Sequence, residues 1–126
     1  MKHEQIFTQH APAPIGPYSQ AIQAGNELYC SGQIPLDPVT AELVGDDAGS
    51  QAERVIENIG AVLCAAGYLY ADVVKTTIYL VDMKDFAAVN AVYEKVFGAT
   101  KPARSTVAVA ALPRGARVEI ECIART

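Results

Sequence analysis

Apolar residues recur at helical spacing in two stretches of the chain. The first stripe predicts a helix over 47–66 and comprises Ala52, Val55, Ile56, Ile59, Val62, Leu63 and Ala66. Ser50 and Glu53 fit a capping box, whereas Asp46 or Asp47 would begin the helix earlier. Gly67 is a natural stop for this helix. The second stripe predicts a helix over 84–97, ended by Gly98, and comprises Phe86, Val89, Tyr93, Val96 and Phe97.

Other stretches have the β-branched composition of strands. Strand character is found at 27–34, 72–82, 105–111 and 117–125. The sequence "PLDPVTAEL" after the first of these predicts a turn before a short return strand. The proline-rich stretch 11–18, "APAPIGPY", predicts an ordered extended arm that delivers Tyr18 to a defined place, because each proline fixes its own φ and biases the residue before it.

This order of elements, ββ(β)-α-β-α-β-β, predicts an α+β fold. We expect one domain over 1–126, with a mixed sheet and two helices packed on one face. Strands 105–111 and 117–125 are expected to form a hairpin around "LPRGA". The second face of the sheet retains apolar positions that no element is left to cover, so we expect other copies of the chain to cover it.

Composition narrows the class of function. The chain has 126 residues, of which 51% are hydrophobic and 19% charged, so disorder is not expected. Its net charge of -4 is opposite to that of a protein that neutralises many phosphates. No apolar run approaches the roughly 20 residues needed to span a bilayer. The start "MKHEQIFTQH" lacks the apolar core of a signal peptide, so we expect a cytoplasmic protein without nucleic-acid or membrane partners.

Cysteine and histidine usage limits the chemistry further. Cys30, Cys64 and Cys122 are odd in number and far apart, so we interpret them as buried free thiols and not as disulfides or metal ligands. His3 and His10 are the only histidines, and both fall in the first ten residues. A histidine-based triad, zinc site or general base inside the domain is therefore not expected. Chemistry here must use Arg, Glu, Tyr, Ser, backbone groups and water.

Two charged residues occupy strand positions within the segment 101–125, "KPARSTVAVAALPRGARVEIECIAR". Arg104 has no carboxylate nearby in the sequence, and burying a guanidinium without a partner costs several kcal/mol. It therefore faces water or meets an anion, and its planar fork suits a carboxylate. In a simple hairpin Arg104 and Glu119 would be roughly 17 Å apart, so they should not touch in one chain. They could meet across a subunit interface.

Each remaining candidate has an ordinary and a functional interpretation. Glu119 and Glu121 either both face solvent, or one of them points into a pocket and orients a water. Tyr18 is either a core aromatic residue or a site residue. The glycine after Ser31 is either a turn glycine or a place where the backbone approaches a ligand. Asn90, in the middle of the second helix, is either a surface residue or a buried hydrogen-bonding residue.

Several motifs taken together resemble the RidA (YjgF) family of reactive-intermediate deaminases. They are "IGPYSQAI", "LYCSGQIPLDP", "ENIGAVLCAAG", "VVKTTIYLVDMKDFAAVNAVY" and "PARSTVAVAALPRGARVEIE". The resemblance covers about 14 to 124 and is most specific between Pro102 and Ile120. It implies a chorismate-mutase-like fold and a homotrimer whose sites lie between subunits.

The resemblance also implies a reaction and its residues. The reaction is hydrolysis of 2-imino or enamino acids, such as 2-aminoacrylate and 2-iminobutanoate, to 2-oxo acids and ammonia, with no cofactor and no metal. Arg104 would bind the substrate carboxylate, and Glu119 would be associated with the reactive water. The remaining site positions would be Tyr18, Ser31, Gly32, Asn90 and Thr106.

One position departs from the family pattern. Many members have cysteine where this chain has Thr106, but it is the backbone N–H there that would help to hold the carboxylate. Two other classes of function stay open at this point. One is a non-catalytic protein that binds a 2-oxo acid, and the other is the ribonuclease, translation-inhibitor or chaperone activity reported for the family.

Overall fold

The two helices begin and end close to the expected residues in the computed structural model, which describes residues 2–126. Helix α1 (Ala48–Ala65) is capped by Asp47, whose side chain accepts a hydrogen bond from the N–H of Ser50 at 2.8 Å. The earlier of the two expected starts is therefore right, and Ser50 is not the cap. Gly67, with φ of +82°, follows the end of α1 as expected. Helix α2 (Phe86–Phe97) follows a short 3₁₀ turn.

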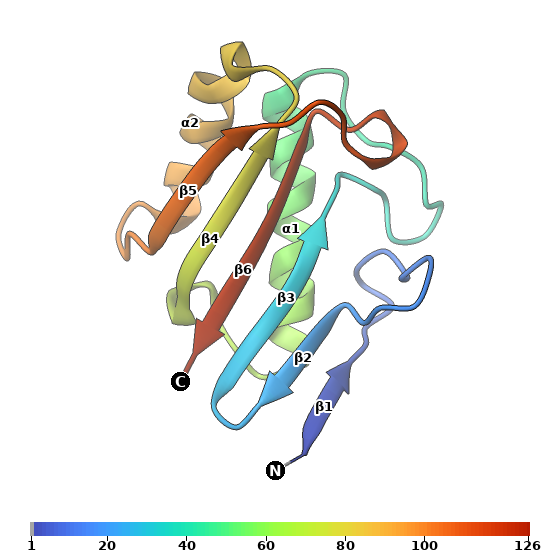
Figure 1. The fold of residues 1–126 in the computed structure, drawn as a ribbon, viewed down its shortest axis with the longest axis vertical. Helices are drawn as coiled ribbons and strands as arrows, with labels where there is room; N and C mark the ends of the chain where they lie inside the picture. Colours follow the sequence, from blue (N-terminus) through green and yellow to red (C-terminus); the bar gives the residue numbers. More distant parts are fainter. Residues whose placement is uncertain (1) are drawn as a thin grey trace.

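Six strands form one mixed sheet in the order β1-β2-β3-β6-β4-β5 (Figure 1). All neighbouring strands are antiparallel except β4 and β5, which are parallel. The two short N-terminal strands had no recognisable apolar alternation and were not expected as strands. The strands are β1 (His3–Ile6), β2 (Ala21–Ala24), β3 (Glu27–Gln33), β4 (Val73–Leu80), β5 (Ala103–Ala108) and β6 (Val118–Arg125).

The expected hairpin between the last two strands is wrong. β4 lies between β5 and β6, and β6 is inserted between β3 and β4 near the middle of the sheet (Figure 1). The segment taken for a tight turn is a 3₁₀ turn (Pro113–Gly115) within a connection that passes over the end of β4. The physical reason lies in burial. β6 buries every second side chain under the helices and so takes two neighbours, whereas β5 is mostly exposed and takes only one.

Both helices pack on one face of the sheet, as expected (Figure 1). The residues that β6 contributes to this side are fully or nearly buried, and they are Val118, Ile120, Cys122 and Ala124. No helix or strand among the described residues covers the opposite face (Figure 1). It retains exposed apolar side chains, with Tyr29 at 43% and Val107 at 42% exposure. We call this surface the open face.

The cysteines divide into two environments. Cys30 and Cys122 are buried directly opposite one another on β3 and β6, as expected for small apolar residues. Cys64 is exposed, so the expectation of burial is wrong for this residue. The reason is helical geometry, because Val62 and Leu63 occupy the buried face of α1 and the next residue turns outward.

Within residues 2–126, neither helix has the length and the apolar character that a membrane-spanning helix needs. The cytoplasmic location stays a prediction.

Candidate functional site

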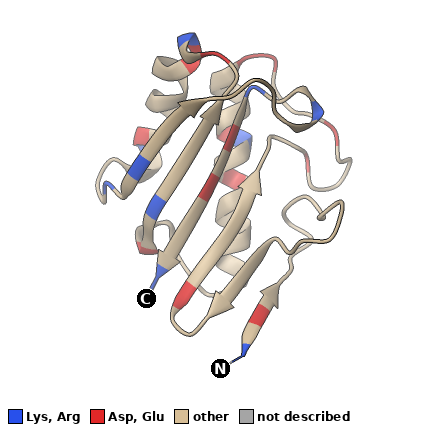
Figure 2. Cartoon of the chain, viewed as in Figure 1, with Lys and Arg blue, Asp and Glu red and all other residues tan. Residues whose placement is uncertain are grey.

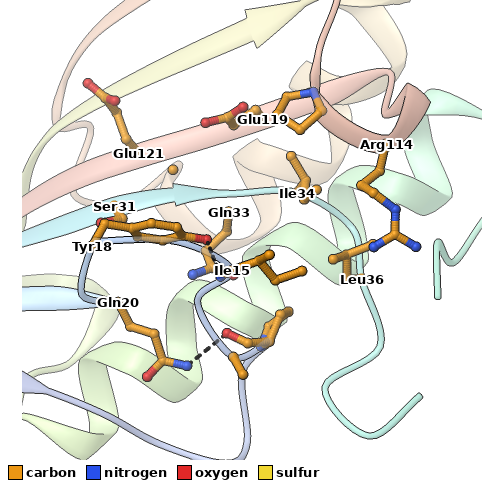
Figure 3. Close-up of a pocket in the computed structure, with 14 residues that line it drawn as sticks. Ile15, Tyr18, Gln20, Ser31, Gln33, Ile34, Leu36, Arg114, Glu119 and Glu121 are labelled. Carbon is orange, nitrogen blue, oxygen red and sulfur yellow. Dashed lines mark hydrogen bonds between the residues drawn. The ribbon is translucent and has the colours of Figure 1, made fainter. Parts of the chain in front are cut away.

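A hollow lies between the N-terminal arm, the end of β3 and the start of β6 (Figure 3). It has a volume of about 650 Å³. Four of the expected site residues line it together: Tyr18, Ser31, Gly32 and Glu119. Glu121 and Arg114 line it as well, with the two carboxylates toward one end and Arg114 toward the other. The sheet therefore gathers an arm residue, a strand glycine and a strand carboxylate that are far apart in the sequence.

Gly32 is required because the Glu119 side chain lies against the backbone of β3. A Cβ atom built on Gly32 would collide with Oε2 of Glu119 and lie 2.8 Å from its Cδ. The φ of Gly32 is not in the left-handed region, so close approach is the reason for glycine here. Burial, followed by the nearby charge of Glu121, raises the pKa of Glu119 above the usual carboxyl value. The contact thus holds a half-buried carboxylate with raised basicity in a fixed place.

We expect Gly32→Ala to lower activity strongly and to change the stability of the fold only slightly. The added methyl displaces the Glu119 carboxylate, and such a shift costs roughly 100-fold in rate when the displaced group acts on the reacting atoms. The measurement is kcat/KM in an imine-hydrolysis assay, alongside thermal unfolding. Gly67→Ala is the control, because a Cβ atom there would meet nothing within 4 Å although its φ of +82° carries some strain. Full activity of Gly32→Ala would show that the Glu119 position does not matter.

The arm that carries Tyr18 is ordered but is not fully extended. Gly16, with φ of +125°, turns the chain, and the N–H of Tyr18 donates to the Gly16 carbonyl at 3.0 Å. The Tyr18 hydroxyl accepts a long hydrogen bond of 3.4 Å from the N–H of Ile15. The Tyr18 side chain is 51% exposed, so it is not a core aromatic residue. Its position at the pocket, with an exposed ring, agrees with the functional interpretation.

Gln20, which no sequence pattern singled out, anchors the same arm. It is 1% exposed, and its side chain bonds to backbone groups of Thr8, Ala11 and Pro12. Ser31 holds the other side of Tyr18, because its hydroxyl donates to the carbonyl of Ser19 at 2.6 Å and its N–H donates to the carbonyl of Gln20. The Ser31 hydroxyl is therefore engaged with the arm, and its expected role in substrate binding stays a prediction.

Two further buried amides fix other parts of the pocket wall. Asn58 on α1 donates to the carbonyls of Ile34 and Leu36. Gln51 accepts from the N–H of Arg117, immediately before β6, and donates to a loop carbonyl. A buried amide is recognisable only once its backbone partners are known, so the sequence carried no signal for these residues. Together with Gln20, these two amides attach the arm, the residues after β3 and the residue before β6 to the core by hydrogen bonds.

Arg104 lies in a different hollow, on the helix side of the edge strand β5. Its Nη1 donates to Oδ1 of Asn90 at 2.8 Å, which brings together two of the expected site residues. Its guanidinium also lies 4.9 Å from the ring centre of Tyr93 and 5.7 Å from that of Phe86. Phe86 was expected in the buried stripe of the second helix, but its side chain is exposed. No carboxylate within residues 2–126 forms an ion pair with Arg104. Its neighbours orient the cation without neutralising it.

Arg104 and Glu119 point to opposite faces of the sheet. Arg104 pairs in register with Thr76 of β4, whose hydroxyl is buried against α2. Glu119 pairs with Tyr79, an odd number of residues further along the same strand and hence on the open face. The expectation that the two side chains do not touch within one chain is confirmed. The reason differs from the one expected, since β4 separates their strands and the pleat turns them to opposite sides.

Thr106 follows Arg104 on the same side of β5, in register with Ile78. Its hydroxyl oxygen is buried and has no hydrogen-bond partner among residues 2–126. β5 is the last strand of the sheet, so every second backbone N–H along it lacks a partner strand. The expected site residues therefore fall into two groups, which we call half-sites. One group contains Arg104, Asn90 and Thr106, and the other contains Tyr18, Ser31, Gly32 and Glu119. Figure 2 shows a basic position on β5 and acidic positions on β6.

Comparison with known proteins places the whole chain among close relatives. A sequence model of the family described as Endoribonuclease L-PSP matches residues 8–126. A RutC family protein of Pyrococcus horikoshii is 57% identical over 121 residues, covering 96% of both chains. A 2-iminobutanoate/2-iminopropanoate deaminase of Mus musculus is 50% identical, covering 94% of this chain and 88% of the mouse protein.

Solved structures of similar proteins superimpose closely on this chain. The structure of a Thermotoga maritima protein superimposes with a TM-score of 0.97 at 50% identity, covering 100% of this chain and 98% of that one. The structure of E. coli TdcF with bound serine superimposes with a TM-score of 0.92 at 41% identity, covering 98% of each chain. These matches confirm the α+β fold with a mixed six-stranded sheet and two helices.

Proposed function

Because the chain belongs to the Endoribonuclease L-PSP family, also called RidA, YjgF or RutC, we propose that it is a hydrolytic deaminase of 2-imino acids. Its substrates would be small 2-imino or enamino acids such as 2-iminobutanoate and 2-aminoacrylate. Its products would be the 2-oxo acid and ammonia. Two relatives support the reaction class. The mouse protein is 50% identical and the goat protein 49% identical to this chain, and both are named 2-iminobutanoate/2-iminopropanoate deaminases.

The Glu119 pocket supplies what imine hydrolysis requires. An iminium carbon is already electrophilic, so the reaction needs a positioned water and a base more than a strong nucleophile. Glu119 is half-buried and held over the backbone of Gly32, and its burial raises its pKa, which makes the ionised carboxylate a stronger base than an ordinary glutamate. Tyr18 borders the same space and would keep the imine in place.

The observation that carries the proposal is the placement of Arg104 and Glu119 on opposite faces of one sheet. A single chain cannot bring the carboxylate anchor and the water-activating group to one substrate. We therefore propose a homotrimer in which Arg104, Asn90 and Thr106 of one subunit complete the pocket containing Tyr18 and Glu119 of the next. The uncovered open face, with its apolar side chains, supports burial against other copies.

A coupled assay tests the proposed reaction. A threonine dehydratase would release 2-iminobutanoate, and its disappearance would be followed with and without this protein. We expect the imine to disappear faster with the protein, in proportion to the amount added. An unchanged decay rate at equimolar protein would refute the deaminase proposal.

A second candidate is a binding protein without turnover, favoured by the solved relative that holds serine. The same pocket would serve, and Glu119 would be dispensable for ligand affinity. Measuring both the ligand affinity and the turnover of Glu119→Gln distinguishes the two. The net charge of -4 gives no support to a nucleic-acid substrate.

A further inference from the structure

Glu121 is a second carboxylate of the pocket, beside Glu119. The two side chains alternate with buried residues along β6, so both extend from the open face about 7 Å apart along the strand. Both line the same cavity, and Figure 3 shows them next to one another along the strand. Their register partners on β4, Tyr79 and Thr77, are uncharged at neutral pH.

No cation within residues 2–126 forms an ion pair with either carboxylate. The ion pairs within residues 2–126 join Arg54 to Glu57, Lys84 to Asp82 and Arg117 to Asp85. Arg114 lies at the other end of the pocket, where its guanidinium donates to the carbonyl of Ala41 at 3.2 Å. Lys75 borders a neighbouring hollow together with Glu121 but forms no ion pair with it. Within one chain the pocket therefore contains two carboxylates that form no ion pair among the described residues, where one carboxylate would suffice to activate a water.

The charges of substrate and product give the second carboxylate a role. The proposed reaction is R–C(=NH₂⁺)–COO⁻ + H₂O → R–CO–COO⁻ + NH₄⁺, which balances in atoms and charge. The carbon–nitrogen double bond becomes a carbon–oxygen double bond, and ammonium leaves with the positive charge. The substrate is a zwitterion with no net charge, whereas the retained product is an anion. A carboxylate near the reacting carbon attracts the iminium group and repels the oxo acid.

We propose that Glu121 is a specificity-determining residue that favours the zwitterionic 2-imino acid over the anionic 2-oxo acid and so limits inhibition by product. The inference rests on the proposed deaminase function. It assigns the two carboxylates separate tasks. Glu119, in contact with Gly32, acts on water, and Glu121 sets the charge preference of the space beside it.

The same placement bears on the pH dependence of Glu119. The groups that face Glu119 are Glu121 on β6, Tyr79 on β4, Tyr18 on the arm and Arg114 on the 3₁₀ turn, whereas β3 contributes only uncharged residues. Removing the charge of Glu121 leaves burial as the cause of the raised Glu119 pKa. The acidic limb of the activity profile should then move to lower pH in Glu121→Gln.

The test measures binding of 2-oxobutanoate by titration calorimetry and, separately, kcat/KM for the imine. In Glu121→Gln we expect affinity for 2-oxobutanoate to rise about three- to tenfold, the effect of one charge removed at this range. We expect kcat/KM for the imine not to rise. Glu121→Asp keeps the charge, so its affinity for 2-oxobutanoate should not rise as it does in Glu121→Gln. Glu4→Gln makes the same change in net charge at an exposed position of β1, outside the pocket, and should leave both values unchanged.

Several results would overturn the inference. Unchanged or weaker product affinity in Glu121→Gln would contradict it, as would an equal gain in kcat/KM, which would show a general charge effect. Failure of the wild type to hydrolyse the imine would refute the proposed function. The calorimetric comparison would still report whether Glu121 repels the oxo acid, so the two failures are distinguishable.

Discussion

Replacing Arg104 by alanine should lower kcat/KM for 2-iminobutanoate by about 100-fold or more, equivalent to about 3 kcal/mol for the loss of a charge-assisted bidentate contact. Within residues 2–126 the cation has a neutral hydrogen-bond partner, Asn90, and two aromatic rings around it but no carboxylate. An anionic ligand is therefore a suitable partner for it. The side chain is exposed in the chain, and its removal should leave the unfolding temperature nearly unchanged.

Two control variants make this result specific. Arg104→Lys keeps the charge but loses the planar fork, so it should recover only part of the activity. Arg125→Ala removes another exposed arginine at the end of β6, away from both half-sites, and should retain full activity. Arg104→Ala that clears the imine as fast as the wild type would show that the carboxylate is held elsewhere.

Replacing Glu119 by glutamine should lower kcat by about 100-fold or more, the usual contribution of a positioned general base, with little change in KM. Glutamine has the same shape and can keep the contact with the Gly32 backbone, so the pocket should stay intact. Unchanged affinity for 2-oxobutanoate with lost turnover would favour an enzyme. Retained turnover in Glu119→Gln would show that Glu119 is not the base. Ligand binding without turnover in the wild type would favour the binding protein that serves as the second candidate.

The wild-type pH profile should carry the signature of the same carboxylate. The pKa of Glu119 is raised by burial and then by Glu121, so the group is protonated over a higher pH range than an ordinary glutamate. A base must be ionised to accept a proton, so activity should fall as the pH is lowered through this raised pKa. The acidic limb should be absent from the residual activity of Glu119→Gln.

The helices could be predicted from the sequence, but the neighbours of the last strands could not. Helix α1 is determined by a single local stripe and by the flanking residues Asp47 and Gly67. Strand pairing depends on long-range burial, and β5 and β6 look equally apolar in sequence. Only the folded chain shows that β6 buries alternate residues between β3 and β4 whereas β5 forms an edge. The tight appearance of "LPRGA" favoured a hairpin that does not exist.

The candidate site was predictable where a residue type was unusual for its place. Arg104 in an apolar segment and a glycine inside a strand stood out, and the structure gives both a physical reason. Gln20 and Asn58 did not stand out, because a buried amide is defined by backbone carbonyls far away in sequence. Arg114 did not stand out either, although it lines the pocket.

The most direct test of the shared site mixes two inactive variants. Arg104→Ala and Glu119→Gln subunits would be unfolded together, refolded and assayed, with each variant treated alone as the control. If each site takes Arg104 from one subunit and Glu119 from another, random assembly restores about a quarter of the sites. We predict activity near that fraction of wild type. Activity no higher than that of the separate variants, in particles shown to contain both, would contradict the account.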